Sequence, residues 1–176
     1  MKKLVIAPHV DDDVLGCGGI IDENTLVLYC GLDESNIKNR PSFETRINEA
    51  NAVKRYLGHN YVLLENEVNN YKVQILISQI EDTINNFKPD QVFIPHPSYN
   101  QDHKVVYDAS LIALRPHDLN HFVGTIAIYE QVHAFLWEGS REFKPNFFIP
   151  IDVNKKINAY NLMKTQVRKF RSPESV

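Results

Sequence analysis

Short apolar runs alternate with longer segments of helical periodicity along most of the chain. The runs end at glycine, proline or charged residues, which is typical of buried strands. The longer segments place an apolar residue at every third or fourth position, which is typical of helices with one buried face. Strands are predicted over residues 4–7, 26–29, 61–64, 91–94, 125–129 and 147–151, and helices over 42–57, 72–87, 105–114 and 154–167.

This alternation predicts βαβ units, in which successive strands are parallel and the connecting helices cover the sheet. We therefore expect an α/β, Rossmann-like fold with a mostly parallel sheet and helices on both faces. A chain of 176 residues most often forms one domain, so we assign residues 1–176 to a single domain. The last segment, Ser172-Pro173-Glu174, has the residues of a helix start, and we expect the native polypeptide to continue beyond Val176.

Composition and charge argue against several classes of function. Hydrophobic residues make up 43% of the chain and charged residues 23%, the balance of an ordinary soluble protein. The net charge is −3, and lysine and arginine are spread along the chain, so the sequence shows no basic patch typical of a nucleic-acid-binding protein. No segment approaches the roughly 18 apolar residues of a membrane span.

The N-terminal apolar run is too short for a signal sequence. The two cysteines, Cys17 and Cys30, do not indicate a disulfide framework. We therefore expect a cytoplasmic protein. Homo-oligomerisation stays open.

The first candidate site follows the first predicted strand, at Pro8-His9-Val10-Asp11-Asp12-Asp13. Ligands of open α/β sheets bind at the carboxyl ends of strands, and imidazole and carboxylate groups both suit a divalent metal. On this interpretation His9 and one aspartate are metal ligands, and a neighbouring aspartate moves protons. The alternative for one aspartate is a helix cap, because Asp12 or Asp13 could cap a helix over residues 14–21.

A second polar cluster, from His96 to His103, follows the fourth predicted strand. Because the carboxyl ends of parallel strands meet at one edge, His103 is a candidate third ligand from a distant part of the sequence. Two histidines, one carboxylate and a water molecule form an established catalytic zinc set. The alternative is that Asp102 caps a helix and His103 is a surface residue of its first turn.

Four further features are explained by ordinary structural roles. The glycines of Leu15-Gly16-Cys17-Gly18-Gly19 lie too far after the strand for a methyltransferase or dinucleotide loop, so we interpret them as allowing close helix packing, with Cys17 a small packed residue. Arg46 and Glu49 are one helical turn apart, which by itself indicates a surface ion pair. His133 follows the fifth strand, and by itself it is more often structural. His59 lies in a loop-like context and is predicted at the surface.

Together these residues resemble the PIG-L/LmbE-like family of zinc-dependent de-N-acetylases over essentially the whole chain. The first turn and the glycines are similar to the family's His-Pro-Asp-Asp turn and Leu-Gly-x-Gly-Gly loop, with Val10 in place of the usual proline. The remaining marks are Arg46-x-x-Glu49-Ala50 ending in Leu57-Gly58, then Asn100-Gln101-Asp102-His103, Tyr129-Glu130 and Lys164-Thr165-Gln166.

The resemblance implies three zinc ligands, a general base and a pocket residue: Zn²⁺ held by His9, Asp12 and His103, with Asp11 as the base and Arg46 lining the substrate pocket. Asn100 stands where many members have a histidine. Its amide cannot donate a proton as an acid, but it can hydrogen-bond an oxyanion and so contact the substrate. The leaving amine would then take its proton from Asp11 or from His133, which we include as a catalytic candidate.

We therefore expect a zinc amidohydrolase that removes an acetyl group from an N-acetylated amino sugar or its conjugate, a small-molecule substrate. One alternative is an enzyme that hydrolyses another amide conjugate. A second is a non-catalytic sugar- or nucleotide-binding domain of the same fold, to which Asn100 gives some weight. A methyltransferase is the most distant alternative.

Overall fold

The computed structural model describes residues 1–33, 38, 40–130, 143–169 and 171–175 of the chain. The strands are β1 (Lys3–Ala7), β2 (Thr25–Asp33), β3 (Asn60–Glu67), β4 (Gln91–Pro95) and β5 (Thr125–Tyr129). The helices are α1 (Asp12–Cys17), α2 (Phe43–Leu57), α3 (Val73–Phe87), α4 (Gln101–Ala113) and α6 (Val153–Asn161), followed by a 3₁₀ turn, η1 (Pro173–Ser175).

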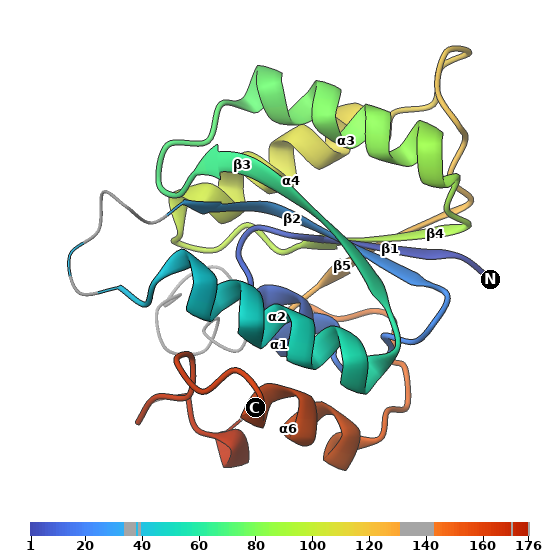
Figure 1. The fold of residues 1–176 in the computed structure, drawn as a ribbon. Helices are drawn as coiled ribbons and strands as arrows, with labels where there is room; N and C mark the ends of the chain where they lie inside the picture. Colours follow the sequence, from blue (N-terminus) through green and yellow to red (C-terminus); the bar gives the residue numbers. More distant parts are fainter. Residues whose placement is uncertain (34–37, 39, 131–142, 170, 176) are drawn as a thin grey trace.

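The five strands form one sheet in the order β3-β2-β1-β4-β5, and every neighbouring pair is parallel. Helices α3 and α4 cover one face, and α1, α2 and α6 cover the other (Figure 1). This confirms the predicted α/β, Rossmann-like class with helices on both faces. The chain moves outward from β1 to β2 and β3, then crosses to β4 on the other side, so the crevice beyond β1 and β4 is a topological switch point.

The central strand β1 is apolar along its length because both of its faces are covered. Leu4 and Ile6 pack into a core with α3 and α4, and Val5 and Ala7 pack into a second core with α1, α2 and α6. β1 is thereby fixed from both sides. The turn that follows it starts from a rigid position.

Two glycines confirm the packing interpretation of the segment after the first strand. A Cβ at Gly16 would overlap the ring of Tyr129, and a Cβ at Gly19 would lie 2.5 Å from Cβ of Ile151. The Tyr129 ring is held in this place because its hydroxyl donates to the carbonyl of Ile6 at 2.9 Å. Cys17 is buried in the same layer, and burial raises the pKa of its thiol.

The predicted boundaries of α2 are confirmed by its caps. The Ser42 hydroxyl accepts from the backbone N–H of Thr45 at 3.2 Å, and Gly58 ends the helix with φ at 82°. The alternative interpretation of Asp12 or Asp13 as a helix cap is wrong, because no side chain caps α1, and the helix ends at Cys17 rather than near residue 21.

Two predictions for the last part of the chain are wrong. Residues 147–151 form no strand, and Phe147 is 71% exposed; their apolar, β-branched composition finds no strand to pair with among the described residues. The helix expected over 154–167 ends at Asn161. The chain turns back there because the buried Tyr160 hydroxyl donates to the carbonyls of Gln166 and Arg171, at 2.7 and 2.9 Å.

Among the helices in the described part of the chain, none combines the length and apolar character needed to cross a membrane.

Candidate metal and catalytic site

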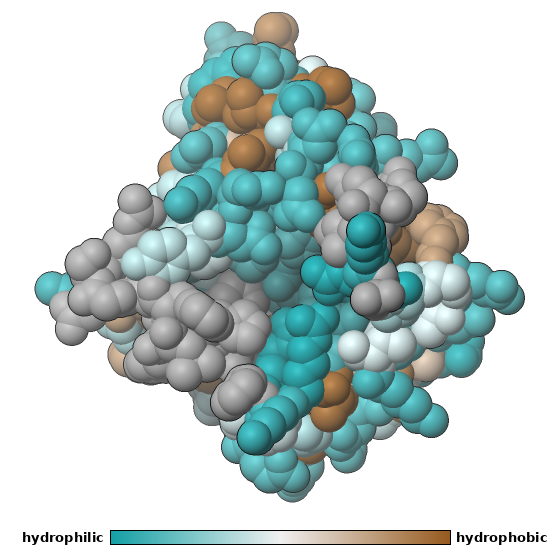
Figure 2. Space-filling model, turned by 90° about the vertical axis from the view of Figure 1, so that its left-hand side faces the viewer, coloured by the Kyte–Doolittle hydropathy of each residue, from teal (hydrophilic) through white to brown (hydrophobic). Residues whose placement is uncertain are grey.

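Polar side chains gather at the carboxyl edge of the sheet, where β1 and β4 end side by side. The turn after β1 carries His9, Asp11 and Asp12, and α4 starts shortly after β4 with Asp102 and His103 in its first turn. Figure 2 looks onto this edge and shows a hollow surrounded mainly by hydrophilic residues. The structure therefore brings together two sequence segments that the parallel topology predicted to meet.

Three predicted ligands converge on one point. The same oxygen of Asp12, Oδ2, lies 3.2 Å from Nδ1 of His9 and 3.2 Å from Nε2 of His103. One ligand atom from each of the three residues lies within 4.8 Å of the others. Ligands of a tetrahedral zinc ion with bonds of about 2.0–2.1 Å lie roughly 3.3 Å apart. The spacing of the carboxylate oxygen and the two ring nitrogens therefore fits a small divalent cation.

The second nitrogen of His9 is held by a carboxylate that sequence reasoning treated only as a helix cap. Nε2 of His9 lies 3.0 Å from Oδ2 of Asp102, and that oxygen also accepts from the backbone N–H of Asn69 at 2.8 Å. A proton on Nε2 directed at Asp102 leaves the lone pair of Nδ1 free on the side of Asp12. This is the usual outer-shell arrangement that orients a metal-binding histidine.

The electrostatics of the cluster favour a cation. Burial by itself would lower the pKa of His9, but hydrogen bonds to Asp102 and Asp12 and the charges of Asp12 and Asp11 raise it to about 10. Burial by itself would raise the pKa of Asp12, but His103 and His9 hold it well below its usual range. Without a metal, a protonated imidazole thus compensates carboxylates that have been removed from water. A divalent ion could take over that role.

Asp11 is buried beside the ligands but makes no contact with their ring nitrogens among the described interactions. Its Oδ2 lies 3.1 Å from Nη2 of Arg171, a residue of the C-terminal segment. Sequence reasoning missed Arg171, because nothing local in the sequence relates it to the first turn. A carboxylate beside a candidate metal ligand is placed to accept a proton from water at that site.

Arg46 and Glu49 are not the surface pair that their spacing alone indicated, since they are 3% and 8% exposed. Nη2 of Arg46 donates to the carbonyl of Val10, and Nη1 lies 3.6 Å from Oε2 of Glu49. Glu49 in turn accepts from the backbone N–H and the hydroxyl of Thr165, at 2.7 and 2.6 Å. Arg46 therefore holds the turn that carries Asp11. Glu49 connects Arg46 to the C-terminal segment through Thr165.

Other predicted residues have different surroundings. Asn100 is exposed and caps α4, because its side-chain oxygen accepts from the backbone N–H of Asp102 at 2.8 Å, which leaves its NH₂ group to donate elsewhere. His133 belongs to the segment 131–142 and lies outside the described residues. His59, predicted at the surface, is instead 1% exposed at the opposite edge of the sheet.

A His-Asp-His cluster with a separate carboxylate at the switch point of a Rossmann-like α/β fold is an arrangement that could hold a metal ion and activate water. Comparison with known families agrees with this interpretation. The family described as PIG-L, GlcNAc-PI de-N-acetylase, matches residues 4–114. That match covers more than half of the chain, and the chain belongs to this family.

Several solved structures share the fold. The conserved protein TT1542 from Thermus thermophilus is 21% identical with a TM-score of 0.73, and the match covers 94% of this chain and 80% of that one. A deacetylase triple mutant involved in the teicoplanin biosynthetic pathway is 18% identical, with a TM-score of 0.72 and coverage of 94% and 83%. GalB, the 4-carboxy-2-hydroxymuconate hydratase from Pseudomonas putida, is 20% identical, with a TM-score of 0.71 and coverage of 94% and 80%. At these identities the likeness shows the fold, which supports more than one chemistry.

Proposed function

We propose that this protein is a zinc-dependent amidohydrolase that removes the acetyl group from an N-acetylated amino sugar or its conjugate. The observation that carries the proposal is the convergence of His9, Asp12 and His103 next to a separate buried carboxylate, Asp11, in a member of a de-N-acetylase family. The ligand set of two histidines, one carboxylate and an open position is the one used by catalytic zinc.

The metal would be held by Nδ1 of His9, Oδ2 of Asp12 and Nε2 of His103. When bound, zinc lowers the pKa of its water to about 7 and polarises the amide carbonyl. Asp102 keeps the His9 ring in the orientation that binding requires, through the contact of 3.0 Å at Nε2. Arg46 keeps the turn between β1 and α1 in place through the Val10 carbonyl.

Asp11 is the proposed general base. It takes a proton from the attacking water, and Arg171, 3.1 Å away, holds its carboxylate in place. The amine that leaves needs a proton, which Asp11 returns or His133 supplies. Asn100, whose NH₂ group is not used by the α4 cap, is the proposed donor to the substrate oxyanion, and Arg46 is the proposed pocket residue.

We further propose that the enzyme is cytoplasmic and acts on a small molecule. The support is that both cysteines are buried and unpaired, which is typical of a reducing compartment.

The test is a metal assay combined with a panel of acetylated substrates. The purified protein is expected to contain about one zinc per chain and to release acetate from N-acetylglucosamine derivatives. His103→Gln should lose the metal and the activity, and the matched control His117→Gln, on a histidine remote from the ligands, should keep both. Zinc without acetate release, but with release of another acid, would favour an enzyme for a different amide. Binding of sugars or nucleotides without any turnover would favour a non-catalytic domain.

A further inference from the structure

The loop between β3 and α3, residues 68–72, lies at the carboxyl edge of the sheet (Figure 1). It is distant in sequence from both segments that supply the candidate metal ligands, and none of its residues belongs to the motifs that indicated the site. The loop nevertheless makes hydrogen bonds to both segments. Tyr71 contacts the segment that precedes His9, and Asn69 contacts the start of α4, where His103 lies.

Tyr71 fixes the start of the turn that carries His9. Its side chain is buried, and its hydroxyl donates to the carbonyl of Pro8 at 2.7 Å. The centre of its ring lies 6.2 Å from the centre of the His9 ring. β2 leaves room for this ring, because a Cβ at Gly31 would lie 2.7 Å from the Tyr71 hydroxyl oxygen. The residue immediately before the first ligand is therefore bonded to the loop.

Asn69 contacts the other segment through its backbone. Its N–H donates to Oδ2 of Asp102 at 2.8 Å, and its carbonyl accepts from Nε2 of Gln101 at 3.0 Å. It makes both contacts with φ at 67°, in the left-handed region that asparagine tolerates better than most residues. Among the described residues, the only other non-glycine residue with a positive φ is Lys88, at the end of α3. The oxygen of Asp102 that contacts His9 thus has a fixed donor.

The ligand set is divided between two elements that this loop joins. His9 and Asp12 follow β1, whereas His103 belongs to α4. Before a metal binds, only contacts within the protein can keep these groups at the right separation. Ligands that must first be ordered cost binding free energy, and outer contacts that order them in advance raise the affinity.

We propose that Tyr71 and Asn69 are positioning residues, which hold the two ligand-bearing segments at a fixed separation and so form the metal site before the metal binds. Neither residue is a metal ligand or a proton carrier, since Tyr71 acts through Pro8 and Asn69 acts through Asp102. The inference rests on the proposed zinc-dependent function and adds to it a loop that the ligands and the general base do not identify.

The first test removes the Tyr71 hydroxyl and compares the result with a matched tyrosine. Tyr71→Phe keeps the ring and loses the hydrogen bond to Pro8. Tyr129→Phe is the control, because both tyrosines are 7% exposed and the Tyr129 hydroxyl also donates to a carbonyl of the N-terminal segment, that of Ile6 within β1. Tyr71→Phe should lower the zinc affinity about tenfold, and Tyr129→Phe should leave it unchanged. Competition with a chromophoric chelator measures both affinities.

Cobalt(II) distinguishes a displaced ligand from a general loss of stability. The visible absorption of bound Co²⁺ depends on the number and arrangement of its ligands. At saturating Co²⁺ the spectrum of Tyr71→Phe should differ from that of the wild type, and the spectrum of Tyr129→Phe should not. Urea unfolding of the metal-free proteins should show similar losses of stability in the two variants. An unchanged zinc affinity or an unchanged cobalt spectrum in Tyr71→Phe would overturn the proposal.

A second pair of variants tests the backbone of Asn69, and it decides the matter if Tyr71→Phe fails to fold. Asn69→Gly allows the left-handed conformation and should keep the zinc affinity of the wild type. Asn69→Val disfavours that conformation and should lower the affinity about tenfold. Lys88→Val, at the other left-handed position, is the control and should lose stability without losing zinc affinity. Equal zinc affinity of the two Asn69 variants would overturn the proposal.

Hydrogen exchange keeps this inference separate from the proposed function. Zinc binding without acetate release would contradict the proposed deacetylation, and the affinities of the variants would still decide the role of the loop. If the wild type binds neither zinc nor cobalt, the proposed zinc function fails and exchange in the metal-free proteins decides. The amide of Asp11, which donates to the His9 carbonyl at 3.0 Å, should then exchange faster in Tyr71→Phe than in Tyr129→Phe. Equal exchange in these two variants would overturn the proposal.

Discussion

Two largely buried histidines at opposite edges of the sheet have opposite protonation behaviour. His9, at the carboxyl edge, has a carboxylate oxygen at both ring nitrogens, and these contacts raise its pKa to about 10 although burial opposes this. His59, at the amino edge just before β3, has no hydrogen-bond partner at either nitrogen among the described residues. Burial, with the nearby charge of Lys54, lowers its pKa to about 4.

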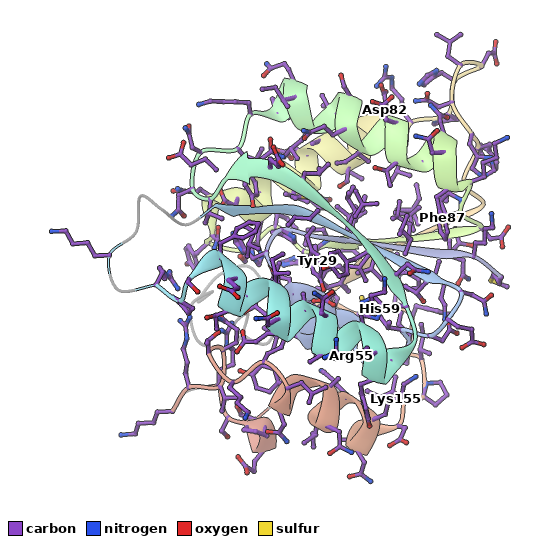
Figure 3. All side chains as sticks on the ribbon, in the orientation of Figure 1. Tyr29, Arg55, His59, Asp82, Phe87 and Lys155 are labelled. Atoms are coloured by element: carbon purple, nitrogen blue, oxygen red, sulfur yellow. The ribbon has the colours of Figure 1, made fainter. Side chains whose placement is uncertain are left out.

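The difference teaches that neighbours, rather than depth, set the direction in which the pKa of a buried histidine moves. Figure 3 shows His59 near the end of α2 and the start of β3, and neither ring nitrogen has a hydrogen-bond partner among the described residues. A neutral imidazole there is a packed core residue. At His9, aspartates from the turn after β1 and from the first turn of α4 instead raise the pKa of the ring, in a cluster whose geometry could hold a cation.

Among the site carboxylates, replacement of Asp11, which does not contact His9, should have the largest effect on turnover. Asp11→Asn preserves shape but cannot accept a proton, so turnover should fall by about 10²–10⁴-fold while the zinc content stays that of the wild type. Acetate release and metal content measured on the same preparation check this. Turnover within about threefold of the wild type would show that Asp11 is not the base, because general base catalysis is worth far more than that.

The carboxylate that holds the outer nitrogen of His9 should have a smaller effect, on the metal rather than on the chemistry. Asp102→Asn removes the charge at Nε2 while keeping an oxygen for the backbone N–H of Asn69. Zinc affinity should fall by about 10–100-fold. When zinc is saturating, the turnover of the variant should return to near that of the wild type. Competition with a chromophoric chelator measures the affinity. Asp108→Asn, an exposed aspartate on the same helix, is the control and should leave it unchanged.

His59 gives the smallest expected effect, on stability alone. The unfolded chain binds a proton at this imidazole below a pKa of 6.5, but the folded protein does so only below about 4. Folding stability therefore falls as the pH decreases from 6.5 to 4, by at most about 3 kcal/mol from this residue.

The variant His59→Leu should remove this part of the pH dependence and should be at least as stable as the wild type at neutral pH, because an unbonded imidazole is costly to bury. Urea unfolding of the metal-free proteins at pH 7.5 and 5 measures the difference. An identical loss of stability in both proteins between these values would show that His59 is protonated in the folded state.

Much of the fold and the centre of the site could be predicted from local patterns. The helix α2 was marked by Ser42 at one end and Gly58 at the other. The meeting of His9, Asp12 and His103 followed from parallel strands, because residues after β1 and β4 share an edge. Such inferences succeed where the signal lies within one helix turn or one strand end.

The rest depended on contacts that no local pattern encodes. Thr165 meets Glu49 and Arg171 meets Asp11 only because the chain after α6 turns back on itself. Residues 147–151 have the composition of a strand, but among the described residues no strand offers a partner, so composition alone misled. His59 looked like a loop residue because its burial comes from the packing of neighbouring elements rather than from its own sequence context.

The separation of the two sheet edges has a practical consequence for handling the protein. Met1 is 75% exposed, and the N-terminus lies at the end of the sheet opposite the carboxyl ends of the strands, where the candidate site is (Figure 1). A dye, affinity tag or solid support attached through the N-terminus would leave the candidate metal and catalytic site open to the solution. The same attachment next to Arg171 would place the label beside Asp11 and block the entrance.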